Sequence, residues 1–403
     1  MLTFHESQER LAALDAGLRA SRVERVPLAS ALGRVLSADV AIDRDQPGFD
    51  RATMDGFAVV ANGGASFEIS GTVLAGQVHE GTLGPGSGVR IMTGAPAPAG
   101  TTVVPIERAD GYTEGDASVT FDSAPEPRKN IAWRGEDARQ GDVLVARGTR
   151  LAASHLSVAA MAGAGVLEVF QRPRVGVVTT GDEVGAAGAA GIRDSNGPLL
   201  DGLMAAVGAT VERRHARDDA AALEDALRGA AQASDVVVTT GGVSMGTHDL
   251  VPQTLAALGF ETVFHRVQVQ PGKPVLVAQR PDGSLFVGLP GNPVSVLATA
   301  HLFLMPALGS LLGGWRPASL TLPMAEDWTH RGKRHLFLPA RVEDGGVRPM
   351  RWNGSGDLIA AAAADGLVEL PVGADLRAGD AARFLPYVGH ALGERAALPD
   401  RTR

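Results

Sequence analysis

The first segment of the chain has apolar positions at helical spacing. With a period of about 3.6 residues, four of them fall on one face, which predicts an amphipathic helix over residues 4–20. These four are Phe4, Leu11, Leu14 and Leu18. Residues 31–42, ALGRVLSADVAI, are typical of a helix end that runs into a strand, and residues 152–164 return to a helical pattern.

Two stretches have a shorter rhythm that is typical of β-structure. Between about residues 45 and 130, short apolar runs alternate with turns rich in Gly, Pro and Asp, which predicts a small β-rich domain. From Pro317 onwards, strand-like runs that include residues 336–338 and 366–370 predict a small β-barrel or sandwich.

Residues 174–308 alternate between apolar strands and helices. The strands expected here are 175–180, 235–240, 262–268, 274–278 and 285–288. The expected helices are 198–207 ended by Gly208, one from its N-cap Asp218 to Ala231, 249–258 ended by Gly259, and one that starts at Pro293. Strands and helices that alternate at this spacing predict a doubly wound, mostly parallel sheet.

One apolar stretch raises the question of a membrane. Residues 294–315 carry no charged side chain and are long enough in principle to span a bilayer. Because the stretch contains Pro306 and hydroxyl residues and follows a strand and a Gly-Asn-Pro turn, we expect a buried helix instead. Residues 1–6 have no basic start and no apolar run, which argues against a signal peptide. We therefore expect a cytoplasmic protein without membrane contact.

Charge and cysteine content narrow the class of function. The formal net charge is −8, so no long-range attraction for nucleic acid or for an anionic membrane is expected. The sequence contains no cysteine, which excludes disulfides, thiolate nucleophiles and zinc–thiolate sites and agrees with a reducing compartment. A length of 403 residues suits roughly two to four domains.

Three glycine-rich turns follow predicted strands of the alternating region. They are TTGDE (179–183), TTGGVSMG (239–246) and GLPGNPVS (288–295). In an open parallel sheet, ligands bind beyond the carboxyl ends of the strands, where glycine lets the backbone approach and helix N-termini offer N–H donors to anions. Each turn alone is more often purely structural, but three at one sheet edge indicate a ligand that contains phosphate.

Acidic side chains accompany these turns. Asp182, Glu183, Asp194 and Asp249 lie in or near the expected phosphate site. Carboxylate oxygens suit Mg²⁺, a hard cation, so the turns predict a magnesium site. Asp249 can equally be the N-cap of the helix that follows it.

The basic residues of the chain are almost all arginines. Lys273 lies inside the Gly-Pro cluster QPGKP (270–274) and is one of three lysines in the chain, so it is a candidate ligand for an anion. Arg331, Lys333 and Arg334 form a second candidate group. A solvated rim is the alternative interpretation for each of these side chains.

The β-rich region has two polar residues that each precede a glycine. Asp55 lies in RATMDGFAV (51–59) and Thr93 lies in IMTGAPAP (91–98). An Asp-Gly pair is usually only a turn. No Ser/His/Asp series and no histidine cluster with metal-ligand spacing stands out. The residues by themselves indicate a cytosolic α/β protein with extra β domains and a magnesium–phosphate site.

The order of these motifs resembles the molybdopterin molybdenumtransferases, the family that includes the C-terminal domain of gephyrin. The matching segments are ALGRVLSADV, RATMDGFAV, VRIMTGAPAPAG, NIAWRGEDA, VGVVTTGDE, DVVVTTGGVSMGTHD, FHRVQVQPGKP, GLPGNPVS and GSGDLIAAAAADGLVELP, and they run through most of the chain. GGVSMG and GDE also fit the single-domain pterin adenylyltransferases, whereas MDGFA, IMTGAP and RGED are specific to the longer family.

The resemblance implies a subunit of four parts around a doubly wound, mostly parallel α/β domain of the molybdopterin-binding type. The parts are an elongated helical and strand domain (1–44 plus 139–172), a β-rich insert (45–138), the α/β domain (173–314) and a C-terminal β-barrel (315–403). It also implies a homodimer in which the β-rich insert of one subunit faces the α/β domain of the other.

The reaction implied by the resemblance is insertion of molybdenum from molybdate into adenylylated molybdopterin. It would use Mg²⁺, release AMP and form molybdenum cofactor, with a pterin adenylyltransferase upstream and molybdoenzymes downstream. Residue by residue, the family's catalytic positions match Asp55, Thr93, Glu183 and Asp249, of which Glu183 and Asp249 would hold the metal. The substrate-binding positions match Gly241, Gly242, Ser244, Lys273, Pro290, Asn292, Pro293 and Ser355.

Two positions depart from the family pattern. Family members commonly carry a second lysine or arginine three residues before Lys273, where this chain has Gln270. The C-terminal region usually has an arginine where this chain has Pro339, although a short gap would bring Arg341 into that place. Two rival functions stay open on the sequence alone: an ATP-using pterin adenylyltransferase and a non-catalytic pterin-binding scaffold.

Overall fold

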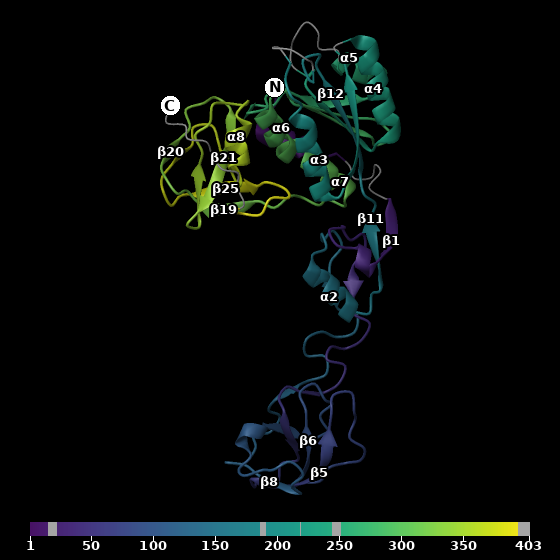
Figure 1. Ribbon diagram of the computed structural model, residues 1–403, viewed down its shortest axis with the longest axis vertical. Helices are drawn as coiled ribbons and strands as arrows, with labels where there is room; N and C mark the ends of the chain where they lie inside the picture. The colour runs from purple at the N-terminus through teal and green to yellow at the C-terminus, as the bar shows by residue number, and fades with distance from the viewer. Residues whose placement is uncertain (15–21, 186–190, 218, 244–250, 394–403) are drawn as a thin grey trace. The chain divides into compact units, whose positions relative to one another are not determined.

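The computed structural model describes residues 1–14, 22–185, 191–217, 219–243 and 251–393. The chain divides into two compact units (Figure 1). Unit 1 contains residues 1–38, 147–152 and 166–403, and unit 2 contains residues 39–146 and 153–165. The segments 1–44 and 139–172, expected to form one domain, contribute to both units, and the four-part division stays a prediction.

Unit 1 contains a mixed sheet that forms the doubly wound part of the chain. Across its described strands the order is β13 (Thr210–Ala216), β12 (Arg174–Thr180), β14 (Val236–Thr240), β18 (Leu285–Leu289), β17 (Leu276–Gln279) and β15 (Glu261–His265). The first four strands are parallel, whereas β17 and β15 run antiparallel to their neighbours. The predicted mostly parallel, doubly wound sheet is confirmed.

Helices cover both faces of this sheet. Successive side chains of a strand point to opposite sides, and here the apolar side chains on both sides are buried by helices. Val175 and Val177 of β12 belong to one core with α3 (Asn196–Val207), α6 (Pro293–Thr299) and α7 (Met305–Leu311). Val178 of β12 belongs to a second core with α4 (Ala220–Ala233) and α5 (Val251–Ala257). All five residues of β14 are buried, as a strand covered on both faces requires.

The first helix is shorter than the apolar pattern predicted. α1 (Phe4–Ala12) begins with a capping box, in which Thr3 and Glu6 bond each other's backbone N–H groups. Its C-cap is Ala13, so the predicted helix end at residue 20 is wrong; residues 15–21 lie outside the described part of the chain.

Two helix starts in the α/β region differ from the prediction. α4 is capped by Asp219, whose side chain accepts hydrogen bonds from the N–H groups of Ala221 and Ala222. The predicted cap, Asp218, lies outside the described residues. α3 begins at Asn196, two residues before the predicted start, but it ends as predicted, because Gly208 has the left-handed φ of 75° that closes a helix.

The uncharged stretch near residue 300 is the core helix of unit 1. α6 continues through a π-helical turn (Ala300–Leu304) into α7. Residues Pro293–Leu311 are long and apolar enough to cross a membrane, but the most apolar window among them is 100% buried inside the protein. The predicted buried helix is therefore confirmed.

The last part of unit 1 is a small closed barrel. Its strands are β16 (Val269–Gln270), β19 (Leu320–Pro323), β21 (His335–Glu343), β22 (Gly346–Pro349), β23 (Gly366–Leu370) and β25 (Ala381–Pro386). They pair in the order β16-β21-β23-β25-β19, with β22 on β21. The bridge between Met324, which follows β19, and Val347 of β22 closes the ring. This confirms the predicted C-terminal barrel.

Smaller elements complete unit 1. β1 (Val23–Pro27) forms an antiparallel ribbon with β11 (Val166–Phe170) and leads into a 3₁₀ turn, Leu28–Ser30. β20 (Trp328–Thr329) pairs with β24 (Asp375–Leu376), and α8 (Leu358–Ala362) begins at Asp357, its N-cap. Phe4 of α1 packs against Phe337 of the barrel with ring centroids 4.8 Å apart.

Unit 2 is the predicted β-rich part. Its largest sheet has the order β7 (Thr102–Pro105), β4 (Gly56–Val59), β6 (Ser87–Ile91), β5 (Ser66–Val73) and β8 (Ser118–Thr120). β3 (Arg51–Ala52) pairs with β9 (Ile131–Ala132), and β2 (Val40–Ala41) pairs with β10 (Val143–Val145). α2 (Ala153–Met161) and a 3₁₀ turn, Ile106–Arg108, are its described helices.

Candidate functional site

The three glycine-rich turns of the α/β sheet meet at one cavity in unit 1. Its volume is about 240 Å³, and its walls come from the carboxyl ends of β12 and β14, the turn after β18, and the starts of α3 and α6. The lining residues are Thr179, Thr180, Gly181, Glu183, Val184, Ile192, Arg193, Asp194, Ser195, Asn196, Thr240, Gly241, Gly242, Gly291 and Pro293. This is the edge at which an open α/β sheet binds its ligand.

Glycine is needed at position 241, where the turn after β14 passes close to the end of β12. Gly241 has a φ of 88°, and a Cβ added to it would lie 2.9 Å from Thr180 Oγ1. A Cβ added to Gly291 would lie 3.9 Å from the Cα of Gly241. The turns after β14 and β18 therefore present backbone rather than side chains to the cavity, although the Gly241 N–H itself donates to the Leu289 carbonyl at 3.0 Å.

Glu183 is an exposed carboxylate on the cavity wall. Its side chain folds back over the turn, because a Cβ added to Gly181 would lie 2.6 Å from Glu183 Oε2. Among the described residues no group of three or more His, Asp or Glu side chains could hold a metal ion by itself.

The second lining carboxylate, Asp194, has a local structural role. It accepts a hydrogen bond from the Gly197 N–H at 2.8 Å, at the start of α3, and forms an ion pair with Arg213 at 3.3 Å. Asn196 Nδ2 donates to the Gly291 carbonyl at 2.8 Å and so ties α3 to the turn after β18. Asp194 therefore shapes the wall and has its oxygens engaged.

The barrel contributes a loop to the start of α6. Asn292 Nδ2 donates to Ser355 Oγ at 2.9 Å, and the Val294 N–H donates to the Ser355 carbonyl at 3.0 Å. Asn292 is the N-cap of α6, but its side chain makes no cap hydrogen bond to that helix. The structure thus brings together Asn292, Pro293 and Ser355, three predicted site residues, while Pro290 is buried just before them.

Lys273 lies on a different loop and is exposed. Its carbonyl accepts a hydrogen bond from the Val267 N–H at 3.1 Å. Gly272, next to it, is pressed against α6, since an added Cβ would lie 2.1 Å from Thr299 Cγ2. Lys273 is not among the residues that line the cavity. Ser244 and Asp249, two further predicted site residues, lie outside the described residues.

Asp55 and Thr93 come together in unit 2. The Thr93 N–H donates to Asp55 Oδ1 at 2.6 Å, and both side chains are exposed. Hydrogen bonds from the backbone and side chain of Thr93 lower the pKa of the Asp55 carboxyl, and the charge of Arg90 adds to this. The turn therefore holds an ionised carboxylate at the surface of unit 2.

Family models match most of the chain. Residues 2–163 match the MoeA N-terminal region (domain I and II), residues 176–310 a probable molybdopterin binding domain, and residues 321–387 the MoeA C-terminal region (domain IV). A molybdopterin molybdenumtransferase from Synechococcus elongatus is 37% identical over 324 residues, which are 75% of this chain and 79% of the relative. One from Staphylococcus aureus is 31% identical over 368 residues, 86% of this chain and 87% of the relative.

The chain belongs to the MoeA family of molybdopterin molybdenumtransferases.

Solved structures agree with this membership. Two crystal structures of a molybdopterin biosynthesis MoeA protein from Pyrococcus horikoshii each align over 96% of this chain and 100% of their own. One has a TM-score of 0.76 at 28% identity and the other a TM-score of 0.82 at 25% identity. Because the family matches extend on both sides of the α/β domain, they argue against a single-domain adenylyltransferase.

The two departures from the family pattern have different surroundings. Gln270 is half-buried in β16 and pairs in register with Leu336 of β21. Pro339 is buried inside β21. Arg341, two residues later, donates from Nε to the Ala363 carbonyl at 2.8 Å, so one edge of its guanidinium is engaged at the end of α8.

Sequence reasoning missed several residues of the cavity wall. Arg193 is exposed and lines the same cavity as Glu183, to which it brings a positive charge. Thr180 Oγ1 donates to the Thr240 carbonyl at 3.2 Å and links the ends of β12 and β14. The polar run IRDSN (192–196) before α3 is the signal for these residues in the sequence, although the apolar pattern predicts a helix start only at Pro198.

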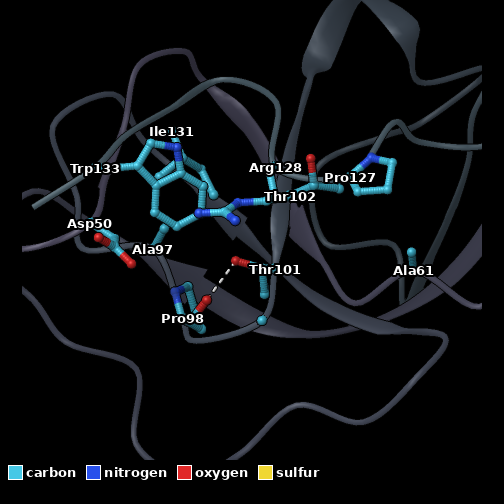
Figure 2. Close-up of a pocket in the computed structure, with 11 residues that line it drawn as sticks. Asp50, Ala61, Ala97, Pro98, Thr101, Thr102, Pro127, Arg128, Ile131 and Trp133 are labelled. Atoms are coloured by element: carbon cyan, nitrogen blue, oxygen red, sulfur yellow. Dashed lines mark hydrogen bonds between the residues drawn. The ribbon is translucent and has the colours of Figure 1, made fainter. Parts of the chain in front are cut away.

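A second cavity, of about 300 Å³, lies in unit 2 (Figure 2). The Arg128 guanidinium stands over the Trp133 ring, 4.3 Å from its centroid. The Thr101 hydroxyl donates to the Pro98 carbonyl at 2.6 Å, and Asp50 Oδ1 accepts from the Arg134 N–H at 2.9 Å. Because these polar groups are satisfied locally and none of the three glycine turns is among the lining residues, this cavity is not the candidate site.

Proposed function

We propose that this chain inserts molybdenum from molybdate into adenylylated molybdopterin, with Mg²⁺, and releases AMP as molybdenum cofactor forms. The observation that carries the proposal is the cavity at which the three glycine turns meet, in a chain of the MoeA family. Its relatives in Synechococcus elongatus and Staphylococcus aureus are named molybdopterin molybdenumtransferase. We place the reaction in the cytoplasm.

The cavity wall suits the phosphates of such a substrate. The backbone of Gly241, Gly242 and Gly291 reaches the cavity without an intervening side chain, and α3 and α6 start at its wall. Because the N–H groups of Gly197 and Val294 already have partners in the protein, the donors proposed for the phosphates are the remaining backbone N–H groups of the glycine turns, and Arg193 adds a positive charge. These groups would hold the adenylyl and pterin phosphates in place while the bond between them breaks.

The residues present fit a magnesium ion that is shared with the substrate. Mg²⁺ is usually held by one or two carboxylates together with substrate phosphates and water. Glu183 offers one exposed carboxylate at the cavity, and Asp249 is proposed as the second. When bound, the ion would neutralise charge on the leaving AMP. Glu183 would orient the ion from the protein side.

In the proposed active site, molybdate would bind near Lys273 and Ser355. An ammonium group acts as a point charge, which suits a tetrahedral dianion. Ser355 is already tied to Asn292 at the start of α6, so its hydroxyl is held in a defined place. Gln270 supplies no charge where many relatives carry a cation, and we expect weaker molybdate binding for that reason.

We further propose that the active form is a homodimer. Asp55 and Thr93 of one subunit would complete the site that contains Glu183, Asp249 and Lys273 of the other. A site shared by two folded parts is a usual place for a ligand. A pterin adenylyltransferase would supply the substrate, and molybdoenzymes would receive the product.

One assay separates this proposal from its rivals. The purified chain is incubated with adenylylated molybdopterin, Mg²⁺ and molybdate, without ATP, and AMP is followed by chromatography. We expect AMP release that requires all three additions and stops when Mg²⁺ is chelated. An adenylyltransferase would instead consume ATP and unadenylylated pterin, and a scaffold would bind the pterin without releasing AMP. Either of these results would overturn the proposal.

A further inference from the structure

An ion-pair network behind the glycine-turn cavity ties its wall to β13, which lies at one end of the described strand order. Arg213 of β13 lies between two carboxylates. Its Nη1 is 2.9 Å from Asp201 Oδ2 on α3, and its Nη2 is 3.3 Å from Asp194 Oδ2 just before α3. Asp194 lines the cavity, whereas Arg213 and Asp201 do not. One guanidinium therefore connects the cavity wall to the body of the sheet.

The other oxygen of Asp194 holds the first turn of α3. Asp194 Oδ1 accepts a hydrogen bond from the Gly197 N–H at 2.8 Å. A Cβ added to Gly197 would lie 2.4 Å from Asp194 Oδ2 and 2.8 Å from Nη1 of Arg213. The ion pair is thus packed directly against the helix backbone, and Gly197 is buried beneath it.

The residues on either side of Asp194 belong to the cavity wall. Arg193 and Asn196 both line the cavity, and Asn196 Nδ2 donates to the Gly291 carbonyl at 2.8 Å, which joins this segment to the turn after β18. Among the described residues that line the cavity, Arg193 is the only lysine or arginine. The place of this positive charge therefore depends on how residues 193–196 are held.

Arg213 also compensates a charge that opposes an anion. Asp194 and Glu183 are the carboxylates on the described cavity wall. The side chains of Asp194 and Arg213 are 24% and 41% exposed, so solvent screens their ion pair less than it screens a fully exposed one. Without Arg213, the Asp194 carboxylate would stand uncompensated on the wall and would repel a phosphate group bound there.

We propose that Arg213 is a positioning residue of the active site, which holds Asp194 and residues 193–196 so that Arg193 binds the phosphate of AMP. Arg213 itself does not touch the nucleotide, because it does not line the cavity. This inference rests on the proposed function, in which AMP is the leaving group. Since the network acts on the phosphate, its loss should weaken AMP binding and spare the nucleoside.

The test measures the binding of AMP, and of adenosine, which lacks the phosphate, to the full-length chain by titration calorimetry. Arg213→Gln should weaken AMP binding roughly 2- to 30-fold, the range for residues that act through a network, and leave adenosine binding unchanged. Arg213→Lys keeps the charge but loses the planar fork, so its AMP affinity should lie between those of Arg213→Gln and wild type.

Arg214→Gln is the matched control for the lost charge. Arg214 is the next residue of β13, forms an ion pair with Glu212 at 2.6 Å and does not line the cavity. This variant loses the same charge and one ion pair from the same strand. It should bind AMP as wild type does.

A second pair of variants disturbs the network without changing any charge. Gly197→Ala would force Asp194 and Arg213 away from the helix backbone and should also weaken AMP binding more than adenosine binding. Gly202→Ala in the same helix is its control, because a Cβ added there meets no atom within 4 Å. It should bind AMP normally. Circular dichroism confirms that every variant is folded.

Three results would overturn the proposal. The first is equal AMP binding by wild type and Arg213→Gln. The second is an equal loss of AMP and adenosine binding in Arg213→Gln, which would make the network merely structural. The third is no AMP binding by the wild-type chain at millimolar concentration. Because molybdenum insertion is not measured, a failure of the proposed reaction leaves this test intact and can be told apart from it.

Discussion

The carboxylate of Asp55 illustrates how the backbone prepares an exposed side chain. The Thr93 N–H lies 2.6 Å from Asp55 Oδ1, and this bond favours the charged form of the carboxyl. Its pKa is lowered accordingly, so the group is ionised at neutral pH. The sequence showed Asp55 and Thr93 as separate turn positions before glycines. Their contact depends on β4 and β6 lying side by side, which no local pattern contains.

Glu183 gives the first prediction at the residue scale. If its carboxylate helps to hold Mg²⁺, Glu183→Gln should raise the Mg²⁺ concentration for half-maximal AMP release by roughly 10-fold or more, the lower end of what a lost supporting group costs in metal affinity. The measurement is a Mg²⁺ titration of AMP release. Asp182→Asn is the control, since Asp182 is an exposed neighbour that does not line the cavity. Equal Mg²⁺ requirements for Glu183→Gln and wild type would remove Glu183 from the metal site.

Lys273 gives a second prediction, which concerns molybdate alone. Lys273→Ala should raise the molybdate concentration for half-maximal rate roughly 10-fold. A hydrogen bond to a charged group contributes about 1.5–3 kcal/mol when it is buried, and solvent screening reduces this contribution at an exposed position such as Lys273. Gln270→Lys should lower that concentration. The pterin concentration for half-maximal rate should stay unchanged in both. If the molybdate dependence moves in neither variant, the oxyanion does not bind beside this loop.

At the scale of elements, β4 is held between two strands at very close range. It pairs antiparallel with both β6 and β7, and a Cβ added to Gly56 would lie 2.0 Å from the Val104 carbonyl oxygen of β7. The motif MDGFA therefore contains a packing requirement as well as a turn. Periodicity located the strand, but only the pairing explains why its first residue is glycine.

This close approach predicts a specific loss of stability. Gly56→Ala should destabilise unit 2 by about 1–3 kcal/mol, the usual cost of forcing extra volume into a packed position. Gly71→Ala in β5 is the matched control, because its added Cβ meets no atom within 4 Å. Thermal unfolding followed by circular dichroism compares the two variants. Similar melting temperatures for both would contradict the packing argument.

The core helix of unit 1 gives a prediction about pH. Burial lowers the pKa of His301 from its ordinary 6.5 to about 4. The unfolded chain takes up a proton on this group below pH 6.5, whereas the folded chain does so only near pH 4. The stability contributed by neutral His301 is therefore complete above pH 6.5 and is lost as the pH falls towards 4.

The measurement compares variants rather than absolute values. Between pH 6.5 and 4, wild-type stability should fall by up to about 1.4 kcal/mol per pH unit from this group. His301→Gln should show a shallower dependence, even if its stability is lower at every pH. His5→Gln is the control, since the His5 side chain is 86% exposed and should keep the wild-type slope. Parallel slopes for all three proteins would exclude His301 as a source of the pH dependence.

At the scale of the whole molecule, the sequence was most informative where a pattern repeats. The strand–helix alternation predicted the doubly wound sheet, and the shorter rhythm predicted the β-rich unit and the barrel. The closure of the barrel by Met324 and Val347 could not be predicted from the sequence. It joins the end of β19 to β22, two segments at opposite ends of the strand order, and no local pattern indicates this pairing. The same holds for the contact of Ser355 with Asn292, which links residues 63 positions apart.

The last prediction concerns the proposed homodimer. Asp55 belongs to unit 2, whereas Glu183 and Lys273 belong to unit 1. If Asp55 of one subunit serves the site of the other, Asp55→Ala and Asp249→Ala should each be inactive alone, with effects that complement each other. After the two variants are mixed, dissociated and reassociated, random pairing makes about half of the dimers heterodimers. Each heterodimer has one site with both lesions and one site with neither.

The mixture should therefore recover about a quarter of wild-type AMP release, since about half of the dimers regain one of their two sites. If both residues instead served a site within one chain, every site would keep one lesion and no activity would return. Native mass spectrometry confirms that heterodimers have formed before activity is compared. A mixture of two Asp55→Ala preparations, treated in the same way, is the control and should stay inactive. A site shared between subunits would leave one intact site in every heterodimer. No recovery of AMP release in the presence of confirmed heterodimers would therefore exclude a shared site.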